Sequence, residues 1–265
     1  YSILDQHSES YRKIRNTFRY LLGNLNDSFT EIELENIDVK NLPELEQFML
    51  HRIYNLDLNF NRYFQNYDFH NLYKELLNFC TVDLSAFYFD IRKDTLYCDP
   101  KDSEKRKSTL LLLNIILNSL LKWFAPILSF TTEEIYQLIS KKEKSIHLEK
   151  FLKFPKKFEN KELNNKWTQL IKIRDVCNRS IEEKRANKEI GSSLEASLEI
   201  KSNKQLLSYS QNTDFAELCI TSHAEIFEHK DESIKVNTTK AKGSKCPLCW
   251  KIKEGRCSRK SCQNT

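Results

Sequence analysis

The sequence has few of the residues that many enzyme sites and membrane proteins require. Only four of its 265 residues are glycine, which argues against glycine-rich phosphate loops and against an all-β fold with many tight turns. No apolar run approaches the roughly 18 residues that a membrane-spanning helix needs. The longest such run, from Leu110 to Leu121, is interrupted by Asn114, Asn118 and Ser119 and predicts a buried helix. We therefore expect neither a phosphate loop nor a contact with a membrane.

Groupings of catalytic side chains are also missing. No Ser/His/Asp grouping is found, and the histidines are isolated from one another, so we expect them at the surface or in helix packing. They are His7, His51, His70, His147, His223 and His229. No signal peptide is found, and we expect a cytoplasmic protein with reduced cysteines. The chain begins at Tyr1 and has one methionine, Met49, which predicts a piece of a longer protein or a processed one.

Cysteine is concentrated at the C-terminal end. Four of the eight cysteines follow the spacing C-x2-C-x7-C-x4-C. They are Cys246, Cys249, Cys257 and Cys262. Two thiolates two residues apart bind one metal from a tight turn, and a second pair completes a tetrahedron around Zn²⁺. Because this segment is too short and too polar to form its own core, we expect one zinc ion to order it.

Two other interpretations of these cysteines remain open. The tail is a disordered basic segment with free thiols, or its cysteines form disulfides. The disulfide interpretation is weaker, because the other cysteines are scattered through predicted helices and strands. They are Cys80, Cys98, Cys177 and Cys219.

Positive charge is concentrated in the same tail. Residues 240–265 hold eight Lys/Arg against one Glu, whereas the whole chain has a net charge of +5, so the remainder sums to −2. Residues 161–188 hold eight Lys/Arg against four acidic residues. Localised charge of this kind suits a polyanion such as RNA, although solvated surface charge is the alternative.

Apolar spacing predicts a mainly α chain. Helical periodicity is found over residues 8–26, from Pro43 toward Phe64, over 68–80, from Ser103 through Trp123, and over 162–188. Residues 131–134 read as a capping box before a helix through Leu138, and residues 83–99 read as a helical turn followed by an irregular aromatic connection. We expect Trp123 and Trp167 in the core.

After residue 194 the period changes to the alternation of strands. Residues 194–200 alternate, as do Leu218 and Ile220 followed by Ile226, which predicts a small sheet beside the last helix. We therefore predict an antiparallel helical bundle over residues 1–150, a long helix with a small α+β module over 151–239, and a tail held by zinc over 240–265.

Several runs resemble bacterial isoleucyl-tRNA synthetases, which are class I aminoacyl-tRNA synthetases. Residues 11–25 (YRKIRNTFRYLLGNL) resemble the opening helix of the anticodon-binding domain. Residues 78–98, 125–134 and 167–196 resemble later parts of the same domain, and the CPLCW run resembles the zinc-binding peptide at its C-terminus. The resemblance covers essentially the whole chain in family order. One departure is the second cysteine pair, since the family commonly carries two C-x2-C pairs around a longer loop.

The resemblance implies a function in protein biosynthesis. It implies the anticodon-side, tRNA-binding C-terminal part of an isoleucine–tRNA ligase, which joins isoleucine to its tRNA using ATP and Mg²⁺. The HIGH and KMSKS signatures of the catalytic domain are absent, so we expect this chain alone to be inactive and monomeric, with the catalytic domain elsewhere in the same polypeptide. A valyl- or leucyl-type synthetase and a stand-alone RNA-binding module are the alternatives.

Four residues are expected to contact RNA. Arg12, Asn16 and Arg19 lie on the polar side of the first helix, where arginines reach phosphates without reading sequence. Trp250 follows the first cysteine pair and is flanked by lysines, which suits stacking with an unpaired base. The alternative for Trp250 is a small hydrophobic plug for the metal module.

Overall fold

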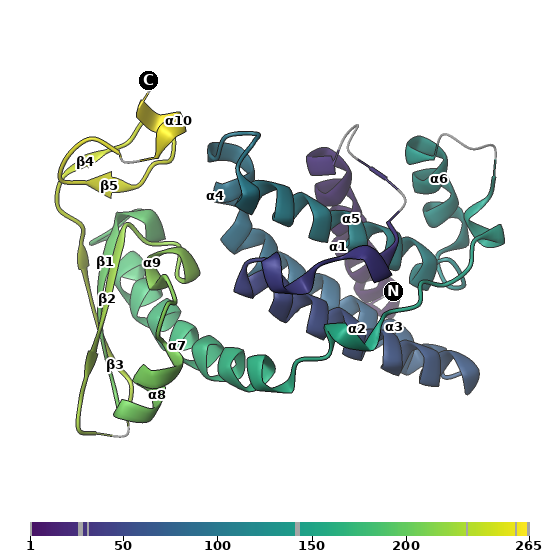
Figure 1. Cartoon of the computed structure of the whole chain (residues 1–265), viewed down its shortest axis with the longest axis horizontal. Helices are drawn as coiled ribbons and strands as arrows, with labels where there is room; N and C mark the ends of the chain where they lie inside the picture. The colour runs from purple at the N-terminus through teal and green to yellow at the C-terminus, as the bar shows by residue number, and fades with distance from the viewer. Residues whose placement is uncertain are drawn as a thin grey trace. The chain divides into compact units, whose positions relative to one another are not determined.

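The chain divides into two units that alternate along the sequence. Residues 1–89 and 101–160 form the first unit, and residues 90–100 and 161–265 form the second. The computed structural model (Figure 1) describes residues 2–25, 29–30, 32–140, 144–231, 233–257 and 259–263. None of the described helices combines the length and the apolarity needed to cross a bilayer.

The first unit is a helical bundle. It consists of α1 (Ser2–Leu25), α2 (Glu44–Gln65), α3 (Phe69–Asn78), the π-helix η4 (Phe79–Phe89), α5 (Glu104–Phe124) and α6 (Ser129–Ile139). Short 3₁₀ turns lie in its connections: η2 (Leu34–Asn36), η3 (Val39–Asn41), η5 (Ile146–Leu148) and η6 (Lys156–Phe158). Helix α1 packs on α5 and η4, α2 packs on α3 and α5, and α6 packs on α5.

One apolar face of each long helix builds the bundle core. On α1 the buried side chains include Ile14, Phe18 and Leu21, which follow the helical repeat. On α5 the burial extends almost around the helix and includes Trp123, as predicted for the core. Each such side chain contributes about 1.5–3 kcal/mol by leaving water, so these faces dominate the stability of the bundle.

The prediction for residues 83–99 is wrong. The region is helical, because η4 continues directly from α3 and leads into α4 (Asp90–Cys98). In a π-helix the hydrogen bonds shift to i→i+5, so the apolar residues no longer follow the 3.6-residue repeat. The hydroxyl of Ser85 donates to the Cys80 carbonyl, five residues earlier, at 2.8 Å. The loss of period made an aromatic helix look like an irregular connection.

The predicted capping box before α6 is also wrong. The helix begins at Ser129, so Thr132 lies inside it and its hydroxyl donates to the Leu128 carbonyl at 3.0 Å. Glu133 does not cap the helix; its carboxylate accepts hydrogen bonds from the Ser145 hydroxyl and the Ile146 amide. The carboxylate therefore fixes the connection that follows α6.

The second unit packs a long helix against a small sheet. It contains α4, α7 (Lys161–Ala186), η7 (Ser193–Glu195), β1 (Ala196–Ser202), α8 (Lys204–Tyr209), α9 (Phe215–Leu218), β2 (His223–Glu228) and β3 (Lys235–Lys240). The strand order is β2-β1-β3, with β1 parallel to β2 and antiparallel to β3. Helix α7 packs on β1 and β3 and buries Trp167, as predicted. The predicted mainly α fold with a small α+β module is confirmed.

The predicted second strand is wrong in part. Leu218 ends α9, and Ile220 lies in a turn with a φ of 57°, so Ile226 is the member of that pattern that lies in β2.

In α7 the buried stripe includes Ile173 and Cys177, whereas Ile171 is half-buried. The tail adds β4 (Ser244–Lys245), β5 (Ile252–Lys253) and α10 (Lys260–Gln263).

Three ionisable side chains of α2 are buried in the bundle: Glu46, His51 and Asp57. His51 is 2% exposed, and its Nδ1 accepts a hydrogen bond from the Asn160 amide at 3.0 Å. Asp57 is 7% exposed, and its Oδ2 accepts from Asn61 at 3.1 Å, whereas its Oδ1 has no hydrogen-bond partner among the described residues. Burial raises the pKa of Asp57 to about 6, although hydrogen bonds from Trp123 and Asn61 lower it.

Replacing Asp57 with asparagine is expected to stabilise the chain in a pH-dependent way. Because the folded-state pKa is raised, the unfolded chain loses this proton first, and folding is penalised increasingly from about pH 4 to pH 6. Asp57→Asn should therefore add up to about 3 kcal/mol at pH 7.5 and little at pH 4. Urea unfolding at both values measures this, and an equal change at both would contradict it.

Candidate metal centre and nucleic-acid interface

Four cysteine side chains of the tail converge on one point. The Sγ atoms of Cys246, Cys249, Cys257 and Cys262 all lie within 4.8 Å of one another, and those of Cys249 and Cys257 are 3.8 Å apart. Three of the four side chains are buried, and Cys257 is half-buried. The structure thus brings the irregularly spaced second pair to the first.

A short hairpin presents the first pair. Strands β4 and β5 pair antiparallel, the Cys246 amide donates to the Lys251 carbonyl at 2.9 Å, and the Trp250 amide donates to the Cys246 carbonyl at 3.0 Å. Gly243 enters this hairpin with a φ of 117°, and a Cβ there would lie 2.1 Å from the Lys253 carbonyl oxygen. Only glycine fits this close approach of two backbones.

The turn between Cys246 and Cys249 also lowers the pKa of one thiol, which favours the thiolate that a metal ion binds. Backbone hydrogen bonds from Cys249 and Leu248 lower the pKa of the Cys246 thiol to about 7. Burial raises the pKa of Cys249, so that thiol holds its proton more strongly in the absence of a cation. A bound metal ion reverses this preference, because it stabilises the thiolate directly.

A fifth cysteine, which sequence reasoning missed, lies against this cluster. Cys98, at the end of α4, packs against the buried cysteines, and its thiol donates to the Leu248 carbonyl at 3.8 Å. Cys98 is about 150 residues from Leu248 in sequence, so no local spacing could indicate the contact. Partial burial alone would raise the pKa of the neighbouring Asp94, but hydrogen bonds and charge from Arg259 lower it below its usual value.

Trp250 does not plug the cysteine cluster. It is 59% exposed, and the ammonium of Lys245 lies 5.5 Å from the centre of its ring. Its backbone φ of 62° lies in the left-handed region, which is unusual for a residue with a side chain. The indole ring is therefore largely accessible to solvent.

The other predicted RNA contacts lie on the outer side of α1. Arg12, Asn16 and Arg19 are all exposed and follow the helical repeat on one face. The guanidinium of Arg12 also forms an ion pair of 2.6 Å with Glu9 in the preceding turn. Arg12 is thus partly neutralised by its own helix.

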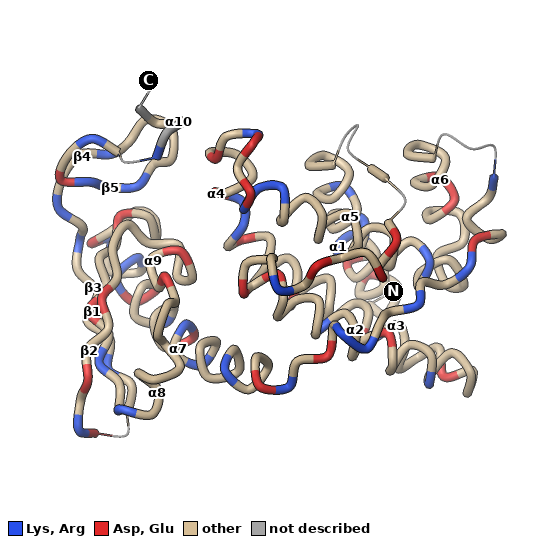
Figure 2. The backbone as a smooth tube through the Cα atoms, viewed as in Figure 1, with Lys and Arg blue, Asp and Glu red and all other residues tan. Residues whose placement is uncertain are grey.

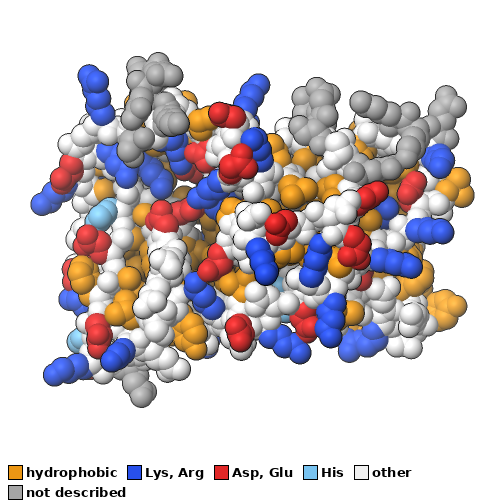
Figure 3. Space-filling model, in the orientation of Figure 1, with side chains coloured by type: hydrophobic (Ala, Val, Ile, Leu, Met, Phe, Trp, Pro, Cys, Tyr) orange, Lys and Arg blue, Asp and Glu red, His pale blue; other side chains and the backbone are white. Residues whose placement is uncertain are grey.

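The two basic regions, α7 and the tail, differ in how many of their basic side chains pair with acidic residues close in sequence. In α7 Lys184 pairs with Glu189, Arg185 pairs with Glu182, and the buried Arg174 donates to the Leu218 carbonyl. In the tail, Lys and Arg follow the hairpin of β4 and β5 (Figure 2). The face drawn in Figure 3 shows acidic and basic side chains intermixed over the helices. The tail is therefore the more uniform basic segment.

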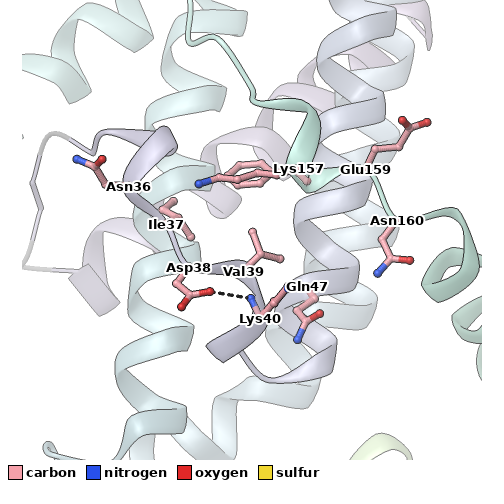
Figure 4. A pocket seen from close by; sticks show the side chains of 10 residues that line it. Asn36, Ile37, Asp38, Val39, Lys40, Gln47, Lys157, Glu159 and Asn160 are labelled. Atoms are coloured by element: carbon pink, nitrogen blue, oxygen red, sulfur yellow. Dashed lines mark hydrogen bonds between the residues drawn. The ribbon is translucent and has the colours of Figure 1, made fainter.

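A shallow cavity of about 520 Å³ lies in the first unit, between the turns η2 and η3 and residues 157–160 (Figure 4). Its walls carry both signs of charge, from Asp38, Lys40, Lys157 and Glu159. The Asp38 carboxylate accepts from the Lys40 amide at 3.2 Å and so caps η3. These lining groups serve local structure, and none forms a carboxylate–histidine or nucleophile–base pair with another.

Comparisons with known proteins agree with this architecture. Residues 46–200 match the sequence profile of the anticodon-binding domain of tRNA ligases. The isoleucine–tRNA ligase of Pelagibacter ubique is 66% identical over 261 residues, which are 98% of this chain and 29% of that protein. The isoleucine–tRNA ligase of Bartonella henselae is 40% identical over 260 residues, which are 94% of this chain and 26% of that protein.

A third relative, the isoleucine–tRNA ligase of Petrotoga mobilis, is 37% identical over 264 residues, which are 95% of this chain and 28% of that protein. The chain spans less than a third of the length of these curated relatives. All three are isoleucine–tRNA ligases, so the valyl- and leucyl-type alternative is not favoured. The chain belongs to the anticodon-binding domains of tRNA ligases and is homologous to the C-terminal part of isoleucine–tRNA ligases.

Proposed function

We propose that this chain is the part of a cytoplasmic, monomeric isoleucine–tRNA ligase that binds the anticodon side of isoleucine tRNA, with one Zn²⁺ in its tail. The observation that carries the proposal is the match over 98% of the chain to an isoleucine–tRNA ligase, together with the converging cysteines. Within this function, we assign the anticodon-binding bundle to residues 1–150 except α4, which belongs to the second unit, the α+β module to 151–239 and the metal-binding tail to 240–265.

The donor set supports zinc. Four cysteine sulfurs with no carboxylate or histidine among them form a closed, soft ligand set, which is typical of structural zinc sites. Tetrahedral coordination with Zn–S distances of about 2.3 Å places sulfurs about 3.8 Å apart, close to the spacing of Cys249 and Cys257. Zinc bound there supplies cross-links between the hairpin and the segment of Cys257 and Cys262, and no reactive water is required.

Binding of RNA rests on charge and on one aromatic side chain. Arg12, Asn16 and Arg19 position the tRNA through its backbone, and the basic tail adds to the attraction. Trp250 offers an exposed ring to an unpaired base. Aminoacylation itself, with its ATP and Mg²⁺, belongs to a catalytic domain of the same polypeptide, and we expect this chain alone to be inactive.

Zinc binding is expected to depend on the cluster cysteines. Purified chain should contain about one zinc ion, and Cys246→Ser should lose most of it, because a structural site needs all four donors. Cys98→Ser is the matched control, since Cys98 contacts the cluster but is not one of the four converging sulfurs. Metal analysis after gel filtration measures both. Unchanged zinc in Cys246→Ser would show that the metal assignment is wrong.

The two classes of RNA contact are expected to respond differently to salt. Arg19→Ala removes a phosphate contact, so it should weaken binding of all tRNAs about equally and reduce the salt slope by about one unit. Trp250→Ala removes stacking, so it should cost about 1–3 kcal/mol with the salt slope unchanged. Filter binding of isoleucine tRNA and a non-cognate tRNA over a salt series distinguishes them.

Two controls sharpen this test. Lys201→Ala removes an equal charge from β1, where Lys201 pairs with Glu199 at 2.8 Å, and should leave the affinity nearly unchanged. Trp250→Phe keeps an aromatic face and should retain most of the affinity. If Arg19→Ala and Lys201→Ala behave alike, the outer side of α1 is not part of the RNA interface.

A further inference from the structure

Arg259 lies in the basic tail, but its guanidinium is paired with two carboxylates of the same chain. Its guanidinium forms a two-pronged pair with Asp94, with a nitrogen–oxygen distance of 3.0 Å on one side and 2.5 Å on the other. Its Nε lies 3.1 Å from the Asp99 carboxylate. The three side chains are each less than a quarter exposed. Two carboxylates therefore engage the planar donor edge that an arginine would otherwise present to a phosphate.

The partner of Arg259 is α4, which is separated from the tail by about 150 residues of sequence. The same helix end makes two further contacts with the tail: the Ser261 hydroxyl donates to the Cys98 carbonyl, and the Cys98 thiol donates to the Leu248 carbonyl at 3.8 Å. Leu248 lies between the first two cluster cysteines, whereas Arg259 and Ser261 lie between the last two. One end of α4 thus touches both halves of the cysteine cluster.

We propose that Arg259 is a positioning residue that latches the metal-binding tail onto α4, so that docking of the tail and binding of the metal stabilise each other. This inference rests on the proposed metal site. With Arg259 held by Asp94 and Asp99, the segment that carries Cys257 and Cys262 has less freedom to lose when the metal binds. By reciprocity, a bound metal must favour docking of the tail on α4 to the same extent.

The neighbouring Arg256 provides a matched comparison. It lies one residue before Cys257, as Arg259 lies two residues after it, and it carries the same charge. Its side chain is exposed and lines an open cavity beside the cysteines, together with Lys245 and Lys253. Arg256 is thus placed for an RNA contact, and Arg259 for a contact within the chain.

The test compares zinc release from four forms of the full 265-residue chain: wild type, Arg259→Ala, Arg256→Ala and the double variant Asp94→Asn/Asp99→Asn. A chromophoric chelator in excess reports the release rate. We expect release on the order of tenfold faster in Arg259→Ala and in the Asp94→Asn/Asp99→Asn variant, because each removes the same charge-assisted pair. Arg256→Ala should release zinc at the wild-type rate.

Combining the three substitutions tests whether Arg259 acts through the two carboxylates. The triple variant should be no faster than Arg259→Ala, since residues of one network are not additive. Arg259→Lys should restore part of the slow release and serves as the measured variant if Arg259→Ala does not fold. Hydrogen exchange in peptides covering residues 90–99 should rise when zinc is removed from the wild type and also in zinc-loaded Arg259→Ala.

Three results would overturn the latch. They are equal release rates in Arg259→Ala and wild type, equal effects of Arg259→Ala and Arg256→Ala, and full additivity in the triple variant. A wild-type chain that binds no zinc would instead contradict the proposed metal site, and the latch with it. Zinc content and release rate therefore separate failure of the latch from failure of the metal site.

Discussion

Four thiols crowded within 4.8 Å in a polar segment define the main physical constraint on this chain. The tail has two short strands and one turn of helix, so its buried apolar surface is small. Sulfurs at this spacing repel one another as thiolates and gain little as thiols, so a shared cation is the strongest stabilising interaction available there. A cation bound there would also fix the turn that carries the exposed Trp250.

The two units obtain their stability from different sources. The bundle is held by apolar helical faces such as that of Ile14, Phe18 and Leu21 on α1. The second unit combines a core between α7 and the sheet with contacts made by α4, and ion pairs contribute to the contacts of α4. Arg92 pairs with Glu217 at 2.7 Å and Arg259 pairs with Asp94. A helical bundle followed by a basic, cysteine-rich tail agrees with membership of the anticodon-binding domains of tRNA ligases.

Helices with a regular apolar repeat were predictable from sequence, and so was the metal-ligand spacing of the first cysteine pair. The π-helix over Phe79–Phe89 was not, because its hydrogen-bond shift removes the repeat on which the prediction depends. The start of α6 was missed because Thr131–Glu134 imitates a cap while lying inside the helix. Cys98 and Arg259 could not be assigned, since their partners lie about 150 residues away in sequence and carry no local signal.

The exposed face of α1 and the basic tail were both visible as charge patterns, but charge alone does not separate a contact with RNA from a contact within the chain. Geometry makes that separation for Arg259, which faces two carboxylates. The most direct measurement is the affinity of zinc-loaded and zinc-stripped chain for isoleucine tRNA and for a non-cognate tRNA at one salt concentration. We expect removal of zinc to reduce the preference for isoleucine tRNA while the helix content of the bundle, followed by circular dichroism, stays the same. Equal affinities and an equal preference with and without zinc would contradict a metal-ordered tail at the RNA interface.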